Sequence, residues 1–291
     1  MKKISRRSFL AAAGLSVAAL ALTACGGSSA STASSVASSA ASSEAASTSA
    51  AAELTTVEAG KLTMATNAAF PPYEMTTDAG EFEGIDVDTA KAIAEKLGLE
   101  LQIDDMDFDA ALLSVQQGKA DIVMAGVTVT DERKAVMDFS DSYATGIQSI
   151  IVPNDSDIAS PDDLAGKKIG TQRGTTGYIY CSDDFGDENV VAYDDGLTAV
   201  QALNNGQVDA VVIDNAPAQE FVAANPGLKV LDTSYAEEDY AIGMAKGSAL
   251  EDAVNKALEE LKADGTLQAI VDKYILSLIH ISEPTRLLSI S

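Results

Sequence analysis

The stretch "YATGIQSIIV" (Tyr143–Val152) is a long extended run near the middle of the chain, and a second run, "YAIGMAK" (Tyr240–Lys246), follows much later. Between the two lies a self-contained block with its own strands and helices. Two lobes joined by two crossing strands would produce this order, and lobes joined in this way can close on something bound between them. A single lobe with a long insertion is the alternative.

Strands alternate with helices on both sides of these runs, which predicts an α/β fold with parallel sheets and crossover connections. The predicted strands span residues 61–67, 99–103, 120–126, 167–172, 208–214 and 228–231. The predicted helices span residues 86–98, 108–118, 196–206, 216–225, 250–265 and 266–275, with shorter helical segments at 160–166, near Thr130 and after Gly174. Asp86 is the expected N-cap of the first helix, and Gly98 is its expected stop.

The N-terminal residues predict export and lipidation. "MKKISRRSFL" is a basic start, and the apolar run after it is too short to span a membrane, so residues 1–24 are typical of a signal peptide. The run ends in "LTAC", which resembles a lipobox that would leave Cys25 lipidated at the new N-terminus. Residues 25–58 contain a Ser/Ala-rich stretch that predicts a flexible tether. The Sec and twin-arginine export routes both remain open.

The C-terminal segment 276–291 begins with "LSLIHISEPTR", which resembles a translated sequencing adapter. We therefore set this segment aside as an artefactual tail. A native C-terminal peptide is the alternative, and the native ending beyond Ile275 stays open. His280, the single histidine, is set aside with the tail.

Composition excludes several classes of function. With 44 acidic and 19 basic residues, the formal net charge is −25, which repels nucleic-acid phosphates. Once Cys25 and His280 are set aside, Cys181 is the remaining thiol, so neither a His-based catalytic triad nor a Cys/His zinc cluster can form. A calcium loop beginning at Asp105 fails, because Ala110 stands where glycine is needed and Gln116 where glutamate is needed. We expect neither a metal nor a cofactor, and we expect no enzymatic activity.

Several segments together resemble one family, the family 3 extracellular solute-binding proteins, which bind polar amino acids for bacterial ABC importers. The matching segments are "TNAAFPPYE" (66–74), "GIDVDTAKAIAEKLG" (84–98), "MDFDAALL" (106–113), "GKADIVMAGVTVTDERKAVMDFSDSY" (118–143), "DLAGKKIGTQRGTTG" (163–177), "GQVDAVVIDN" (206–215) and "LKADGTLQAIVDKY" (261–274). The resemblance implies a two-lobed periplasmic-binding-protein fold of type II, with two hinge strands and the ligand in the cleft between the lobes. Lobe 1 would span residues 59–146 and 241–275, and lobe 2 residues 147–240.

The resemblance also implies the ligand-binding residues. Arg133 matches the arginine that clasps the α-carboxylate of the ligand, in keeping with the planar fork of a guanidinium. Asp214 matches the acid that binds the α-ammonium group. Thr175, in the glycine-rich turn "GTQRGTT", matches the position that supports the carboxylate at a helix N-terminus. Phe70 and Phe108 match the two aromatic residues that enclose the side chain of the ligand.

Four further positions complete the expected site. Gly126 and Thr128 lie just upstream of Arg133, on the turn that would face the ligand. Asn67 stands where relatives for cationic ligands often carry Asp, and Gln172 stands where some relatives carry Lys. Neither of these two positions offers a charge. This pattern favours an uncharged polar or modestly apolar amino acid, and it does not name which one.

The sequence and its family resemblance therefore predict a lipid-anchored extracytoplasmic binding protein, expected to be a monomer, that delivers a free amino acid to an ABC permease and ATPase. Two alternatives share the fold. One is a dehydratase acting on aromatic amino-acid precursors, and the other is a ligand-sensing domain of a signalling system. The sequence does not say whether the envelope is Gram-positive or Gram-negative.

Overall fold

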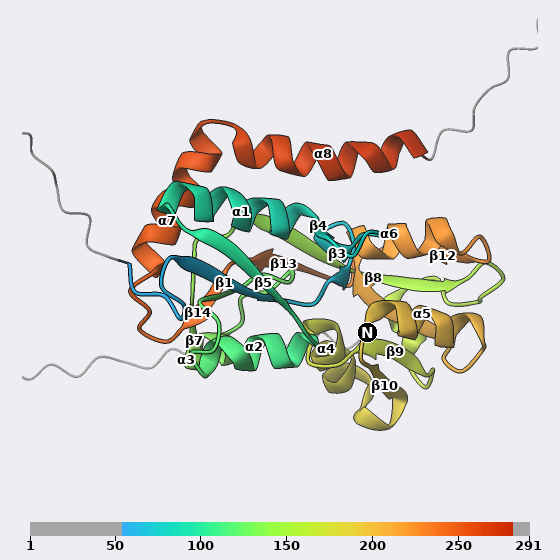
Figure 1. Cartoon of the computed structure of the whole chain (residues 1–291). Coiled ribbons are helices and arrows are strands. Elements are labelled where there is room, and N and C mark those ends of the chain that lie inside the picture. The colour runs from blue at the N-terminus through green and yellow to red at the C-terminus, as the bar shows by residue number, and fades with distance from the viewer. Residues whose placement is uncertain (1–53, 282–291) are drawn as a thin grey trace, which may run out of the picture. The chain divides into compact units, whose positions relative to one another are not determined.

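The computed structural model describes residues 54–281, with side chains described as far as Ile275. Two β-sheets with helices on both faces form the body of this part of the chain (Figure 1). The predicted signal peptide, Cys25, most of the predicted tether and residues 282–291 lie outside the described residues. We call the sheet that contains β1, with its helices, lobe 1, and the sheet that contains β8, with its helices, lobe 2.

The sheet of lobe 1 has five strands. Their order is β5 (Glu100–Asp105), β1 (Lys61–Thr66), β6 (Ile122–Val123), β14 (Gly243–Ala245) and β7 (Met137–Phe139). The first three are parallel to one another, whereas β14 pairs antiparallel with both β6 and β7. Strand β14 therefore returns the chain to this sheet from lobe 2.

Helices cover both faces of the lobe 1 sheet, as expected when parallel strands are joined by crossovers. The helices of this lobe are α1 (Ile85–Leu97), α2 (Phe108–Gln116), α3 (Asp131–Val136), α7 (Glu251–Ala263) and α8 (Thr266–Ile281). Side chains of β1 alternate between the two faces: Leu62 and Met64 belong to the core cluster that contains Ile93 of α1, and Ala65 belongs to the cluster that contains Phe108 of α2. This alternation fixes which face each helix covers.

The sheet of lobe 2 has six strands. Their order is β10 (Val190–Tyr193), β9 (Ile169–Gln172), β11 (Ala210–Asp214), β8 (Ala144–Pro153) and β12 (Leu228–Val230), with β13 (Ala236–Tyr240) also paired to β8. Its helices are α4 (Thr176–Phe185), α5 (Gly196–Asn204), α6 (Asn215–Ala224) and the short η1 (Pro161–Leu164) and η2 (Asp187–Asn189). A small hairpin sheet of β2 (Ala69–Phe70), β3 (Glu74–Thr76) and β4 (Phe82–Glu83) completes the described elements.

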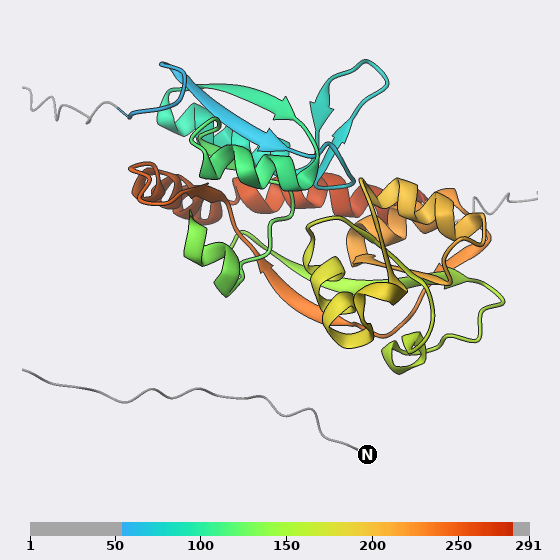
Figure 2. The same cartoon turned by 90° about the horizontal axis from the view of Figure 1, so that it is seen from below.

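The chain passes between the two sheets twice, once between β7 and β8 and once between β13 and β14 (Figure 2). Strands β8 and β13 lie antiparallel, with Ala144 opposite Tyr240 and Gln148 opposite Ala236. Both crossings therefore lie side by side. The predicted two-lobed α/β fold with paired hinge strands is confirmed, and the alternative of one lobe with an insertion is wrong. The second extended run begins at Ala236, four residues earlier than predicted.

Three local predictions were wrong. Asp86 does not cap α1: the N-cap is Gly84, and the buried Asp86 carboxylate accepts hydrogen bonds from Gly126 N (3.0 Å) and Tyr143 Oη (2.7 Å). The strand predicted over residues 120–126 is restricted to Ile122–Val123, because the chain then turns into the pocket loop. Helix α8 continues to Ile281, past the expected end at Ile275.

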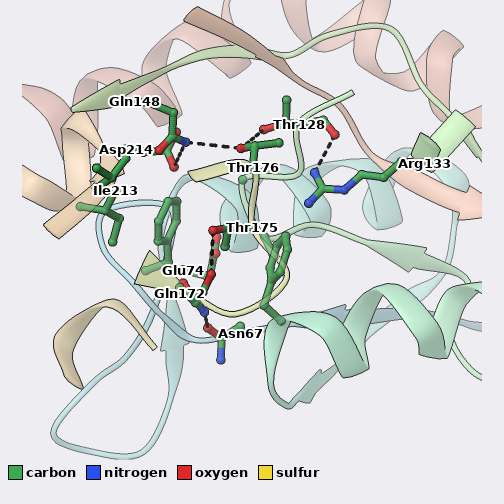
Figure 3. A pocket seen from close by; sticks show the side chains of 15 residues that line it. Asn67, Glu74, Thr128, Arg133, Gln148, Gln172, Thr175, Thr176, Ile213 and Asp214 are labelled. Carbon is green, nitrogen blue, oxygen red and sulfur yellow. Dashed lines mark hydrogen bonds between the residues drawn. The ribbon is translucent and has the colours of Figure 1, made fainter. Parts of the chain in front are cut away.

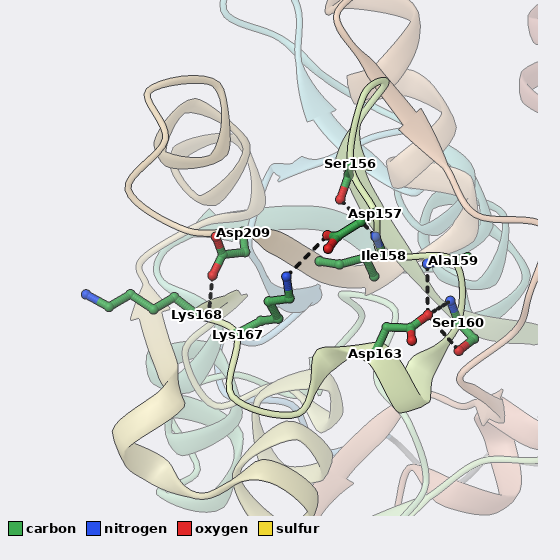
Figure 4. A network of polar contacts seen from close by, with 9 residues as sticks. All are labelled: Ser156, Asp157, Ile158, Ala159, Ser160, Asp163, Lys167, Lys168 and Asp209. Carbon is green, nitrogen blue, oxygen red and sulfur yellow. Dashed lines mark hydrogen bonds and ion pairs between the residues drawn. The ribbon is translucent and has the colours of Figure 1, made fainter.

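A network of polar contacts holds the loop between β8 and β9 (Figure 4). The Asp163 carboxylate accepts hydrogen bonds from the backbone N–H groups of Ala159 and Ser160, each at 3.0 Å, and thus caps η1. Lys167 forms an ion pair with Asp157 at 3.2 Å. These contacts anchor the start of β9, the strand that ends at the pocket. Among residues 54–281, no helix is both long and apolar enough to span a membrane.

The crossing strands are packed around the ring of Tyr240, which is fully buried. A Cβ atom added to Gly146 would lie 2.4 Å from Cζ of that ring. We therefore expect Gly146→Ala to lower the free energy of unfolding by about 1–3 kcal/mol, because the crowded ring must shift. Gly227→Ala is the matched control, since its Cβ would meet nothing within 4 Å. Urea unfolding that shows equal stability for the two variants would contradict this account of the hinge.

Candidate functional site

One pocket lies between the lobes, and all nine residues that the sequence predicted for the site line it (Figure 3). Lobe 1 contributes Asn67, Phe70, Phe108, Gly126, Thr128 and Arg133, and lobe 2 contributes Gln172, Thr175 and Asp214. Six more residues line the pocket without having been predicted: Glu74, Ala125, Gln148, Thr176, Val212 and Ile213. The pocket therefore takes its walls from both lobes.

Arg133 extends from the first turn of α3 into the pocket and is 8% exposed. Thr130 caps this short helix by accepting a hydrogen bond from Arg133 N (3.2 Å), which directs the side chain. The guanidinium donates to Thr128 O in lobe 1 (2.8 Å) and to Gly174 O in lobe 2 (3.1 Å). Burial lowers the pKa of Arg133, and the negative charge of Glu238 opposes that shift. Arg133 is thus a buried cation that contacts both lobes.

Asp214 ends strand β11 on the opposite side of the pocket from Arg133 (Figure 3). Its carboxylate accepts a hydrogen bond from Gln148 Nε2 (2.9 Å) and another from the hydroxyl of Tyr240. Burial raises the pKa of Asp214 to about 7, and these two hydrogen bonds oppose the shift. A buried carboxyl group and a buried guanidinium therefore mark two sides of one cavity.

The N-terminus of α4 faces the same pocket. Thr175 is the N-cap, and its hydroxyl accepts from Tyr178 N (3.3 Å) while donating to Gln172 O (2.8 Å). The hydroxyl that was expected to support a ligand carboxylate is therefore already engaged within the turn. Thr176, the first helical residue, lies beside Thr128 of lobe 1, with their hydroxyl oxygens 3.5 Å apart.

Two amide side chains join the lobes at the end of the pocket far from Asp214 (Figure 3). Gln172 Nε2 donates to Asn67 Oδ1 at 2.8 Å, and Asn67 Nδ2 donates to Met106 O at 3.0 Å. Both residues are buried. This wall of the pocket is polar and carries no charge.

Aromatic rings line the pocket between these polar groups. Phe70 stacks on Tyr73 with ring centroids 5.8 Å apart, and the Arg133 guanidinium carbon lies 5.4 Å from the centroid of the Phe108 ring. Gly126 has a φ of 54°, and a Cβ atom there would lie 2.8 Å from the Phe70 ring. The turn therefore requires glycine both for its backbone conformation and for the space that the ring occupies.

Glu74 is the lining residue that sequence reasoning missed with the largest consequence. It is fully buried beside Asp86, and burial followed by the charge of Asp86 raises its pKa well above the usual value. Glu74 lies within the quoted segment "TNAAFPPYE", so the residue was visible. The sequence did not show that the Glu74 side chain points into the pocket, because the turn at Pro71 and Pro72 decides which side chains of this segment do so.

Gln148 and Glu238 were missed for another reason. Gln148 lies on β8, which was predicted as a crossing strand, and an extended pattern does not show which of its side chains face the pocket. Glu238 lies on β13, ahead of the second run that the sequence predicted. Among the residues with described side chains, no cluster of three or more His, Cys, Asp or Glu could hold a metal ion.

The buried Asp214 makes stability depend on pH. An unfolded Asp has a pKa of about 4, so the folded protein binds this proton more tightly. The contribution of Asp214 to the free energy of unfolding is therefore full below about pH 4 and is lost as the pH rises through about 7. We expect wild type to lose stability relative to Asp214→Asn over this interval in thermal unfolding. The exposed Asp155→Asn should give a curve parallel to wild type, and a parallel Asp214→Asn curve would contradict the burial effect.

Comparisons with known proteins identify the family of this chain. Residues 62–277 match the model of the bacterial extracellular solute-binding proteins, family 3. The L-cystine-binding protein TcyJ of Escherichia coli is 34% identical over 221 residues, which cover 75% of this chain and 83% of that protein. The arginine-binding extracellular protein ArtP of Bacillus subtilis is 34% identical over 224 residues, covering 74% of this chain and 86% of that protein.

A solved structure, an ancestral arginine-binding protein bound to glutamine, is 42% identical with a TM-score of 0.71, over 74% of this chain and 97% of that chain. The family match covers every residue of the pocket, and it covers both sheets except for Lys61 at the start of β1. The resemblance expected from the sequence motifs is therefore confirmed: the chain belongs to the bacterial extracellular solute-binding proteins, family 3.

Proposed function

We propose that this protein is the extracytoplasmic substrate-binding component of an ABC importer and that it holds one free amino acid between its lobes. The observation that supports this most directly is the placement of Arg133 and Asp214. A guanidinium from lobe 1 suits an α-carboxylate, and a carboxylate from lobe 2 suits an α-ammonium group. A zwitterion would contact both lobes at once, so its binding would favour the closed arrangement.

The ligand that we propose has an uncharged polar side chain. Asn67 and Gln172 form a neutral wall, and the raised pKa of Glu74, caused by burial and Asp86, favours its neutral carboxylic acid form. A neutral carboxyl group can donate a hydrogen bond to an amide or hydroxyl of the ligand. The names of two relatives fit such a ligand, since one binds cystine and one is bound to glutamine.

A cationic side chain is the second candidate, and Glu74 is the observation that favours it. Glu74 is buried and forms no ion pair with a basic residue of the described part of the chain. A ligand cation would therefore stabilise the charged form of Glu74. ArtP, named as an arginine-binding protein, is among the relatives.

The remaining features of the proposal concern the whole chain. We propose that residues 1–24 direct export, that Cys25 carries a lipid anchor, and that residues 25–58 tether the domain to the membrane. The lobes would comprise residues 59–146 with 241–275, and 147–240, while 276–291 would be an artefactual tail. The protein would act as a monomer, deliver its ligand to a permease and ATPase, and catalyse no reaction. A binding screen of the twenty amino acids is therefore a more direct first test than an enzyme assay.

A thermal-shift screen of the twenty amino acids tests the proposed ligand class, because a ligand that binds the native state raises the unfolding temperature. We expect the largest shift from an uncharged polar amino acid, with glutamine as the reference compound. A larger shift from arginine or lysine would replace this class with the cationic one. No shift from any of the twenty would contradict amino-acid binding altogether.

Removal of the Arg133 guanidinium tests the proposed carboxylate contact. Loss of one member of a buried charge pair costs about 2–5 kcal/mol, so Arg133→Ala should weaken ligand binding by roughly thirtyfold to several thousandfold. Arg173→Ala is the matched control, because Arg173 lies on the adjacent turn but is half exposed and pairs with Asp194. Calorimetry that gives Arg133→Ala the affinity of wild type would show that the guanidinium does not bind the ligand.

A further inference from the structure

Glu238 is a buried carboxylate on the crossing strand β13, and it does not line the pocket itself. Its Oε2 atom accepts three hydrogen bonds, from Thr128 Oγ1 (3.1 Å), Thr176 Oγ1 (3.0 Å) and Gln148 Nε2 (3.0 Å). All three donors do line the pocket. They come from lobe 1, from the N-terminus of α4 and from β8, so one oxygen atom connects both lobes and a crossing strand.

The protons of these donors can be assigned from the geometry. A threonine hydroxyl has one proton, and in both Thr128 and Thr176 the shorter contact is the one to Glu238. The 3.5 Å contact between the two hydroxyl oxygens therefore needs no proton. Gln148 Nε2 has two protons, and its two short contacts are to Glu238 and Asp214 (2.9 Å). Gln148 Nε2 also lies 3.5 Å from Thr176 Oγ1, but both of its protons are directed at the two shorter contacts. Each hydroxyl oxygen consequently keeps a lone pair for a donor in the pocket.

Charged and titratable groups surround Glu238 on several elements. Arg133 of α3, Tyr180 of α4, Asp214 of β11 and Tyr240 of β13 all interact with it electrostatically. After burial, which is the largest cause, the charge of Glu238 contributes to the raised pKa of Asp214. Glu238 therefore makes the electrostatic potential on the Asp214 side of the pocket more negative than Asp214 alone would.

We propose that Glu238 is a positioning residue for recognition of the α-ammonium group: by accepting the protons of Thr128 and Thr176, it turns both hydroxyl oxygens into acceptors for that group. The inference rests on the proposed function, since it assigns the ammonium to the Asp214 side of the pocket. Glu238 acts through the two hydroxyl groups and needs no contact with the ligand.

Two substitutions separate the hydrogen bonds of Glu238 from its charge. Glu238→Met keeps the length of the side chain but removes the acceptor, so the hydroxyl protons are free to turn toward the pocket. We expect it to weaken binding of L-glutamine at pH 8 by about 10- to 100-fold in calorimetry, the range for hydrogen bonds to charged groups. Glu238→Gln keeps an acceptor oxygen and should weaken binding less. L-arginine is titrated in parallel as the second probe.

A double-mutant cycle tests whether Glu238 acts through the hydroxyl groups. In a Thr128→Val, Thr176→Val background, Glu238→Met should have little further effect on affinity, because the groups that it positions are gone. Fully additive losses would overturn the proposal. Glu237→Gln is the matched control: it removes the same charge from the neighbouring, exposed position of β13 and should leave affinity unchanged.

The pH profile supplies a readout that a general loss of packing would not move. Binding of an ammonium group needs ionised Asp214, so wild-type affinity should fall as the pH drops below about 7. Glu238→Gln removes a neighbouring negative charge, and the fall should then begin at a lower pH. This readout also remains usable if Glu238→Met fails to fold.

Three results would overturn different claims. If Glu238→Met binds as wild type does, the positioning role is wrong while the proposed function stands. If Glu238→Gln leaves the pH profile where wild type has it, the effect of the Glu238 charge on Asp214 is wrong. If wild type binds neither L-glutamine nor L-arginine, the proposed function is contradicted first, and the role of Glu238 falls with it.

Discussion

The buried guanidinium of Arg133 imposes the constraint on which the rest of the pocket depends. A cation removed from water must be compensated by nearby acceptors and negative charge. The structure supplies one carbonyl from each lobe, the face of the Phe108 ring, and the negative potential of Glu238. Because these groups come from both lobes, satisfying one charge also brings the lobes together. A ligand carboxylate would provide the same compensation with a full negative charge.

The buried carboxyl groups of the two lobes accept hydrogen bonds from residues of the crossing segments. Tyr240 at the end of β13 donates to Asp214 in lobe 2, and Tyr143, the residue just before β8, donates to Asp86 in lobe 1. Each crossing segment therefore contributes a tyrosine hydroxyl to a buried carboxyl group in a lobe. Burial nevertheless raises the pKa of Asp86 to about 6 and that of Asp214 to about 7. The hinge and the electrostatics of the pocket are thus built from the same residues, and a change in one will affect the other.

Much of the fold and part of the site could be predicted from the sequence, because the local patterns that mark strands and helix ends are strong. The alternation of strand and helix segments predicted the fold class, Gly98 and the residues near Thr130 and after Gly174 marked helix ends, and the family resemblance pointed to Arg133 in the pocket loop. The errors occurred where long-range contacts override a local signal. Asp86 has the position of a cap, but its carboxylate accepts hydrogen bonds from Gly126 and Tyr143, residues that are distant in the chain. The segment 120–126 is apolar enough to continue as a strand. The chain nevertheless turns at Gly126, which packs so closely against the Phe70 ring that a Cβ atom would not fit.

The amino-acid sequence by itself determined the α/β class and the two crossing runs, because the order of strand and helix segments is a property of neighbouring positions. The family, and with it nine of the residues that line the pocket, followed from the resemblance of several segments to that family. Only the tertiary structure decided which other polar groups face that pocket. Glu74 reaches it from a hairpin, while Gln148 lies on a crossing strand and Glu238 stands behind it on another. Their roles depend on which side of a strand faces the cleft and on which donors meet one carboxylate oxygen, and that is set by the packing of segments far apart in the chain.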